Sequence, residues 1–297
     1  MSELVRVGDV VRDRYRLVGE LGRGGMGVVW HGVDLTSGEE VALKFVQLAT
    51  AGLHATERFF VETRALRRLA GPHTVRILDC GEVTPDGTPY LAMELLCGED
   101  LRSILSRRGR LPALESIRWI REAAEGVAEA HVAGIVHRDL KPSNLFVAES
   151  LEGPLVKVID FGLAKVRASA RSIQALTKTG STFGSLRYAS PEQALSAKDA
   201  DARSDVWSLG VTLYELIAGR TPFDAPTEAR FRANVALEDP LPLSASFDVP
   251  RGLDELVARA LAKAPERRHA DAQALVDALA ALERSAGSSA PRTDRRG

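Results

Sequence analysis

A glycine-rich hexapeptide, GRGGMG at 22–27, is followed at once by a β-branched and aromatic run, VVWHGV at 28–33. Gly22, Gly24 and Gly27 have the G-x-G-x-x-G spacing of phosphate-binding turns, although dense glycine clusters also occur in ordinary turns. A dinucleotide-binding fold requires a helix to begin at these glycines, because the pyrophosphate rests on the helix N-terminus. Valine and tryptophan favour a strand instead. The run after the hexapeptide therefore argues against that fold.

The neighbours of the hexapeptide exclude a second class of nucleotide site. A Walker A loop needs Lys and then Ser or Thr where Val28 and Val29 stand. The pair Glu39 and Glu40 lies near the distance of a ribose-binding acid, but acids are common in a turn such as TSGEE. Upstream, residues 15–21 also read as a strand. The hexapeptide is thus predicted to join two strands, with a backbone that can fold over phosphates.

The composition indicates a soluble globular protein. The chain has 297 residues, 45% of them hydrophobic and 27% charged, which suits one large domain or two lobes. The 39 Lys and Arg nearly balance the 40 Asp and Glu, so no basic field indicates a nucleic acid partner. Cys80 and Cys97 are too few for a disulfide framework, which favours a reducing, cytoplasmic location. Neither a signal peptide nor a membrane-spanning run is expected in this chain.

A lysine and a glutamate follow the hairpin at positions that are otherwise apolar. Residues 40–46 (EVALKFV) read as a third strand that carries Lys44. Residues 55–69 read as a helix in which Glu62, Leu66 and Leu69 share one face. An acid on the inward face of a helix needs a partner. Lys44 is the nearest candidate, although a lysine there could also extend its amine to solvent from an edge strand.

A second group of polar residues lies between apolar segments in the middle of the chain. Residues 111–135 are predicted to be a helix whose buried stripe is Leu114, Ile117, Ile120, Ala124, Val127 and His131. The segment VHRDLKPSNLFV comes next and is predicted to be two strands flanking a loop that holds Asp139, Lys141 and Asn144. A further strand, LVKVI, leads into Asp160.

Six motifs in this order resemble those of the eukaryotic-type protein kinases, and most of all the bacterial Ser/Thr kinases of that family. They are the glycine loop, the strand lysine, the helix glutamate, H-R-D-x-x-x-x-N, D-F-G and A-P-E. The one departure is Ser190, which stands where the last motif has alanine. The resemblance covers about residues 15–283, and the ordered set is far more specific than any one motif.

The resemblance implies an α+β, bilobal protein kinase fold. Such a fold has a small β-rich N-lobe with one main helix and a larger, mostly helical C-lobe. On this chain the implied divisions are an N-terminal extension at 1–14, the N-lobe at 15–96, the C-lobe at 97–284 and a polar, disordered tail at 285–297.

The implied cofactors are ATP and Mg²⁺, with Mn²⁺ as an alternative to Mg²⁺. The glycine loop would cover the phosphates, while Lys44, oriented by Glu62, would hold the α and β oxygens. Val29 and Ala42 would form the roof of the adenine slot, Phe146 its floor and Met93 its gatekeeper, with 94–96 as the hinge. On pattern alone these apolar residues read as plain core. The implied ATP-binding residues are Leu21, Gly22, Arg23, Gly24, Gly25, Met26, Gly27, Val28, Val29, Ala42, Lys44, Met93, Glu94, Leu96 and Phe146.

The catalytic roles carried over from the family concern four polar residues. Asp160 and Asn144 would hold the metal, because hard cations prefer oxygen ligands. Asp139 would accept or orient the proton of the substrate hydroxyl, and Lys141 would neutralise the γ-phosphate in transit. Lys141, two residues after Asp139, is the family's usual sign of a Ser/Thr kinase. In isolation each acid could instead be a turn former or a loop cap.

The resemblance implies structural roles for several other residues. His137 would pack against the phenylalanine of D-F-G. Asp205 could be a plain N-cap of a helix at 206–218, or could lie under the catalytic loop as in the family. Glu192 would pair with an arginine late in the chain, and Arg268 fits that position.

A long, basic, hydroxyl-rich stretch lies between Asp160 and Glu192. By position in the family Thr177 and Thr179 are the candidate phosphosites, ahead of Ser181 and Thr182. A phosphate there would pair with Arg138 and order the loop, although the stretch could also be an ordinary solvated loop. Ser185 stands where these kinases usually carry threonine, and its hydroxyl would bond to Asp139.

The leading hypothesis is an active Ser/Thr protein kinase of bacterial signalling that phosphorylates proteins and itself. Its partners would be protein substrates and a second copy of the chain for trans-autophosphorylation. A pseudokinase that only binds partners is the alternative, but all four of Lys44, Asp139, Asn144 and Asp160 are present. A nucleotide-dependent oxidoreductase is disfavoured by the strand after Gly27.

Overall fold

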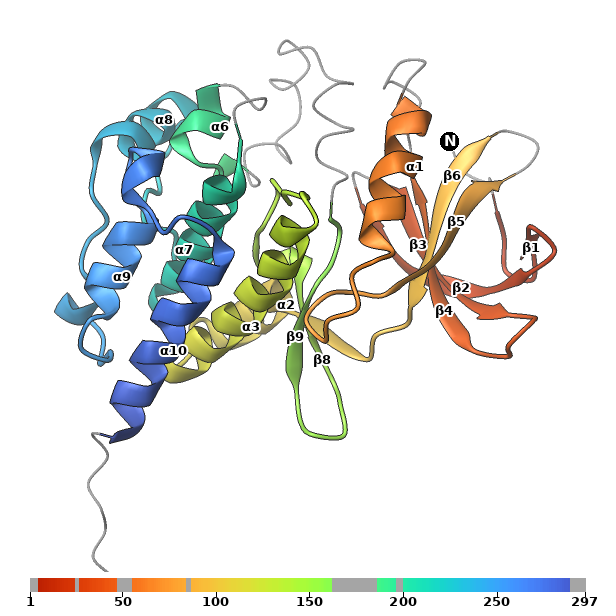
Figure 1. The fold of residues 1–297 in the computed structure, drawn as a ribbon, viewed down its shortest axis with the longest axis horizontal. Coiled ribbons are helices and arrows are strands. Elements are labelled where there is room, and N and C mark those ends of the chain that lie inside the picture. Colours follow the sequence, from red (N-terminus) through yellow and green to blue (C-terminus); the bar gives the residue numbers. More distant parts are fainter. Residues whose placement is uncertain are drawn as a thin grey trace, which may run out of the picture.

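The computed structural model describes residues 5–24, 27–46, 55–83, 87–161, 186–195 and 200–288. They form two lobes, one built mainly of strands and one mainly of helices (Figure 1). This arrangement is the α+β, bilobal one that the sequence predicts. No helix among the described residues is long and apolar enough to cross a membrane.

The smaller lobe is built on a six-stranded antiparallel sheet with the strand order β1-β2-β3-β4-β6-β5. One helix, α1, lies beside β5 (Figure 1). The elements of this lobe are β1 (Val10–Val11), β2 (Tyr15–Gly24), β3 (Gly27–Asp34), β4 (Glu40–Val46), α1 (Ala55–Leu66), β5 (Ile77–Val83) and β6 (Thr88–Glu94).

The strands that the sequence predicts around the hexapeptide are present. β2 and β3 pair in antiparallel register up to Gly24 opposite Gly27, so the glycines do join two strands. β4 has the predicted bounds. Helix α1 ends at Leu66 and not at Leu69, because the next residues turn toward the other lobe, where the Glu129 carboxylate accepts hydrogen bonds from two of their backbone amides.

A small second sheet connects the lobes in the order β7-β8-β9. Its strands are β7 (Gly98–Asp100), β8 (Leu145–Ala148) and β9 (Leu155–Val158). Gly98 lies so close to β8 that a Cβ there would come within 2.0 Å of the Val147 carbonyl oxygen, and its φ is +136°. Only glycine satisfies both conditions, so the chain leaves the first lobe through a fixed backbone contact.

The larger lobe is helical, and its helices pack around α7. Its elements are α2 (Leu101–Arg108), α3 (Ala113–Val132), the 3₁₀ turn η1 (Pro142–Asn144), α6 (Pro191–Leu195), α7 (Ala202–Ala218), α8 (Glu228–Leu237), η3 (Leu243–Ala245), α9 (Leu253–Ala260), η4 (Pro265–Arg267) and α10 (Ala272–Ser288). Helices α3, α9 and α10 all contact α7. Every residue of α7 from Ser204 to Ile217 is buried, so this helix is the centre of the lobe.

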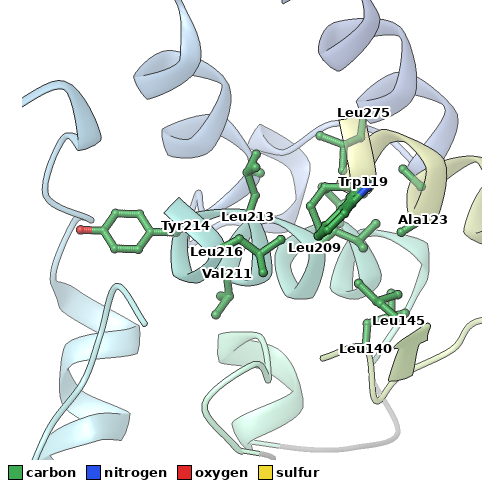
Figure 2. Close-up of a cluster of buried hydrophobic side chains, with 14 of the residues drawn as sticks. Trp119, Ala123, Leu140, Leu145, Leu209, Val211, Leu213, Tyr214, Leu216 and Leu275 are labelled. Atoms are coloured by element: carbon green, nitrogen blue, oxygen red, sulfur yellow. The ribbon is translucent and has the colours of Figure 1, made fainter. Parts of the chain in front are cut away.

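Apolar side chains from several elements meet around α7. Figure 2 shows Leu209 and Leu213 of α7 near Trp119 of α3 and Leu275 of α10, with Leu140 and Leu145 from the loop and strand that follow α3. Each such buried leucine contributes roughly 2 kcal/mol of transfer free energy. This cluster therefore fixes the segment around residue 140 against α7, which is almost entirely buried.

The buried stripe predicted for α3 is correct in all but its first member. Ile117, Ile120, Ala124 and Val127 are almost fully buried, whereas the Leu114 side chain is 52% exposed. Leu114 is the second residue of the helix, and the inward position of that first turn belongs to Ala113. His131 lies on the stripe as predicted, with an 8% exposed side chain.

The loop between α1 and β5 attaches the smaller lobe to α3. The Glu129 carboxylate accepts hydrogen bonds from the Ala70 and Gly71 amides at 2.7 and 2.9 Å. Gly126, one turn earlier, lies against the loop so closely that a Cβ would come within 2.2 Å of the His73 carbonyl oxygen. The two lobes thus meet at this loop as well as at β7.

Candidate active site

A lysine and an aspartate pair where the two lobes face each other. Lys44 Nζ lies 2.5 Å from Asp160 Oδ1, and the Lys44 side chain is only 5% exposed. Lys44 comes from β4 and Asp160 follows β9, so this ion pair crosses between the lobes. Glu62 lies half-buried on α1. Its pairing with Lys44 stays a prediction.

A second lysine and aspartate pair on the loop before β8. Lys141 Nζ donates to Asp139 Oδ2 at 2.7 Å, and both side chains are mostly buried. Asn144 Nδ2 donates to the Asp139 carbonyl at 2.7 Å, and the Ile159 amide donates to the Asn144 carbonyl at 3.0 Å. Hydrogen bonds therefore connect Asp139 through Asn144 to the residue next to Asp160.

The strand predicted just before Asp139 is absent. The backbone amides there bond to a carboxylate instead of to a neighbouring strand. Asp205 Oδ2 accepts a hydrogen bond from the His137 amide and Oδ1 accepts one from the Arg138 amide, both at 2.8 Å. Asp205 is fully buried and also lies 2.9 Å from His131 Nε2. A plain N-cap role for Asp205 is wrong, because α7 begins at Ala202 and its cap is Asp201.

One of the paired acids, Asp160, and the residue before the other, Arg138, have left-handed backbones. Arg138 has φ 68° and Asp160 has φ 65°, values that cost non-glycine residues free energy. His137 bridges these two strained places, because its Nε2 lies 3.0 Å from the Ile159 carbonyl and its ring packs on Phe161 at 4.9 Å between centroids. The predicted contact of His137 with that phenylalanine is confirmed.

The residues predicted to enclose adenine come from strands of both sheets and from the residues that follow β6. Ala42 and Met93 form one buried cluster, with Val29 and Leu96 packed against it. Phe146 is half-buried on β8, opposite Asp100 of β7. A small apolar pocket lies beside this cluster and reaches Lys44. Of the described residues predicted for the adenine site, only Met93 and Lys44 line this pocket, so the adenine slot stays a prediction.

The glycine turn is only partly described. Leu21, Gly22, Arg23 and Gly24 end β2, and Gly27 and Val28 begin β3. Arg23 pairs with Glu20 along the same strand, at 2.7 Å. The remaining predicted loop residues, Gly25 and Met26, lie outside the described residues.

Asn144 and Asp160 carry oxygen atoms that fit a hard divalent cation whose other ligands come from phosphate and water. The Asn144 amide nitrogen already donates to the Asp139 carbonyl, so the amide oxygen is the atom available for a metal. Asp160 contacts Lys44 through Oδ1. Within the described parts of the chain no three His, Cys, Asp or Glu residues gather as a self-contained metal site. An Asp and an Asn suit Mg²⁺, which usually takes few protein ligands beside substrate phosphates.

Comparison with known proteins decides the family. A family model described as "Protein kinase domain" matches residues 15–279. The chain belongs to the protein kinase family. Members of this family use ATP and a divalent metal.

The similar curated proteins are bacterial Ser/Thr kinases. The chain is 36% identical over 293 residues to "Serine/threonine-protein kinase pkn3" of Myxococcus xanthus, covering 96% of this chain and 53% of that protein. It is 37% identical over 291 residues to "Serine/threonine-protein kinase PknA" of Mycobacterium tuberculosis, covering 97% of this chain and 65% of that protein. The chain thus spans only part of the length of these relatives.

The fold has close counterparts among solved kinases. The crystal structure of the Mycobacterium tuberculosis PknI kinase domain matches with a TM-score of 0.71 and 28% identity, covering 94% of this chain and 99% of that chain. The predicted protein kinase fold is thereby confirmed. The residue roles within the site remain predictions.

A mostly buried ion pair fixes the C-terminal end of the stretch from Asp160 to Glu192, which corresponds to the activation segment of protein kinases. Arg268 Nη1 and Nη2 donate to the two carboxylate oxygens of Glu192 at 2.7 and 2.8 Å, as the sequence predicts. Burial alone would raise the pKa of Glu192, but the Arg268 guanidinium outweighs it and lowers the pKa from 4.5 to about 2. The candidate phosphosites Thr177 and Thr179, and also Ser181, Thr182 and Ser185, lie outside the described residues.

Sequence reasoning missed one ion pair at the predicted hinge. Lys157 Nζ donates to Glu94 Oε1 at 2.8 Å, and the Arg76 amide donates to the same oxygen at 2.8 Å. The lysine in the apolar run LVKVI was the available signal, since a charged residue in such a strand needs a partner.

Proposed function

We propose that this kinase domain transfers the γ-phosphoryl group of ATP to Ser or Thr hydroxyls of proteins, with Mg²⁺ as the metal and Mn²⁺ as an alternative. The strongest support comes from two ion pairs, Lys44 with Asp160 and Lys141 with Asp139. Hydrogen bonds of Asn144 connect the two places. Charges in this arrangement can align a triphosphate and a hydroxyl, which is most of what phosphoryl transfer requires.

The proposed reaction assigns one task to each group. Lys44 would hold the α and β phosphate oxygens, while Asn144 and Asp160 would hold the metal, which neutralises charge on the phosphates. The substrate oxygen attacks the γ-phosphorus, the bond from that phosphorus to the bridging oxygen breaks, and ADP leaves. Asp139 takes the hydroxyl proton, and Lys141 offsets the charge of the moving phosphoryl group.

The lysine at position 141 favours serine and threonine over tyrosine, and the bacterial relatives carry the same specificity in their names. We propose further that the domain autophosphorylates in trans on Thr177 or Thr179 as a transient homodimer. Its use of ATP and its two cysteines suit the bacterial cytoplasm. Its near-neutral charge balance gives no reason to expect a nucleic acid partner.

Labelled ATP tests the reaction directly. The protein is incubated with Mg²⁺ and γ-labelled ATP beside Asp139→Asn, and exposed Asp248→Asn serves as a matched control. Label should enter the wild type and the control, and Asp139→Asn should lose at least about a hundredfold in rate. Equal labelling of wild type and Asp139→Asn would refute the catalytic assignment, and binding of ATP without any transfer would indicate a pseudokinase.

Mass spectrometry tests the autophosphorylation sites. After incubation with ATP, phosphate is expected on Thr177 or Thr179, and a Thr177→Ala/Thr179→Ala variant should lose it. Modification found only in the tail beyond residue 288 would contradict the proposed sites.

A further inference from the structure

The peptide unit that joins Arg138 to Asp139 is held at both of its polar atoms. Its N–H group, on Asp139, donates to His137 Nδ1 at 3.3 Å. Its carbonyl, on Arg138, accepts a hydrogen bond from Gln193 Nε2 at 3.1 Å. Rotation of this peptide unit would move the Asp139 side chain, because the unit is bonded to the Asp139 Cα atom. The Arg138 backbone on the other side of the unit is held at a strained φ, so it has little freedom to compensate for such a rotation.

The Gln193 amide bridges two segments with a defined orientation. Its Oε1 accepts hydrogen bonds from the Ser190 amide and the Ser190 hydroxyl, both at 3.1 Å. The reverse orientation would place the amide oxygen against the Arg138 carbonyl and the amide nitrogen against an N–H donor. The donor and acceptor pattern therefore fixes this orientation.

Gln193 itself lies on a segment that is fastened to the helical core. The Tyr188 hydroxyl donates to Glu215 Oε2 of α7 at 2.7 Å, and Ser208 of α7 donates to the Tyr188 carbonyl at 2.8 Å. Glu192 is held by Arg268, as described above. The glutamine thus connects a fixed segment at the end of the activation segment with the backbone of the general base.

We propose that Gln193 is a positioning residue for Asp139, which fixes the Arg138–Asp139 peptide unit through the Arg138 carbonyl. This inference rests on the proposed kinase function. The Arg138 N–H donates a hydrogen bond to Asp205, and the Arg138 carbonyl accepts one from Gln193 at the end of the activation segment. These two hydrogen bonds, called the backbone clamp below, fix Arg138 at both of its polar backbone atoms. A fixed position of residues 186–195 therefore also fixes the backbone next to Asp139, the residue proposed to accept the proton.

Two substitutions separate the donor of Gln193 from its bulk. Gln193→Glu keeps an acceptor for Ser190 and loses the N–H donor to Arg138, while Gln193→Met keeps the length and loses both. Gln273→Met is the matched control, because Gln273 makes a similar side-chain bond to Asp277 on the exposed face of α10. In both Gln193 variants we expect kcat to fall about tenfold, the effect of one buried hydrogen bond. KM for ATP should stay within about twofold, because Lys44 and the glycine turn are untouched.

Hydrogen exchange of residues 137–145 measures the same clamp without activity. Exchange there should be faster in both Gln193 variants than in the wild type, and unchanged in Gln273→Met. The proposal is overturned if exchange is unchanged, or if kcat of an active wild type is matched within twofold by Gln193→Glu and Gln193→Met. A wild type that transfers no phosphoryl group would refute the kinase function instead, and the exchange result would still decide whether the clamp exists.

Discussion

Removal of Arg268 is expected to destabilise the helical lobe more than most single substitutions. Its side chain is fully buried and bonds to both oxygens of Glu192. The same guanidinium donates to three backbone carbonyls, those of Ala262, Lys263 and Arg203, at 2.8 to 3.2 Å. Breaking a buried pair by deleting one partner costs about 3–5 kcal/mol. We therefore expect Arg268→Met to lose about 4 kcal/mol, or about 10 °C in melting temperature.

The pH dependence identifies the cause of that loss. Because the folded pKa of Glu192 lies below its usual value, the pair stabilises the native state above about pH 4.5, and this stabilisation is lost as pH falls toward about 2. In Arg268→Met the same buried carboxylate has no cation, so its pKa should rise. The destabilisation relative to wild type should therefore shrink as pH falls from about 7 to about 5.

Urea unfolding of wild type, Arg268→Met, Glu192→Gln and the double variant provides the measurement. The double variant should be less destabilised at neutral pH than the sum of the two single variants, because the charges are removed together. Strict additivity, or a loss in Arg268→Met that is the same at pH 7 and pH 5, would refute the argument that an uncompensated buried carboxylate causes the loss.

Three further substitutions test the hinge, a buried cation and the glycine turn. Lys157→Met should raise KM for ATP about fivefold to tenfold with kcat nearly unchanged, since the Glu94 anchor is lost; steady-state kinetics with unchanged KM would exclude this role. Burial lowers the pKa of Lys263 from 10.5 to about 8, so the charged amine destabilises the native state below about pH 8. This destabilisation disappears as the pH rises from about 8 to about 10.5. Lys263→Met should therefore raise the urea midpoint at pH 7 but not at pH 10.5. Gly27→Ala should lower the melting temperature, because its Cβ would meet a backbone oxygen at 1.8 Å with φ +138°, whereas Gly24→Ala, in open space, should not.

The parts of the fold that the sequence predicts well are those with a strong local pattern. The run 28–33 and the strand at 40–46 are rich in β-branched and apolar residues, and both are strands in the sheet. The helix at 111–135 has a clear apolar stripe, and α3 occupies residues 113–132. The continuous apolar run of β4 corresponds to burial of both its faces, and the apolar stripe of α3 corresponds to burial of one face.

Prediction fails where long-range contacts replace local structure. Residues 135–136 are apolar and read as a strand, but the next two amides bond to the Asp205 carboxylate, which is distant in sequence. Ser190 and Gln193 form a local capping box that the sequence shows, but the bond from Gln193 to the Arg138 carbonyl, 55 residues earlier, has no local signal. The motif residues themselves could be identified only as a set, since each is also a common turn or core residue.

Strain in the backbone explains why so many of these long-range contacts converge on one place. Arg138 and Asp160 both have left-handed backbones, each costing of order 1–3 kcal/mol, and neither is a glycine. Such geometry persists only where the surroundings impose it. At Arg138 the amide is held by Asp205 and the carbonyl by Gln193, and beside Asp160 the Ile159 amide is held by Asn144 and its carbonyl by His137. The residues that precede Asp139 and Asp160 are thus fixed by bonds to both polar backbone atoms, which restricts the backbone from which both carboxylates project.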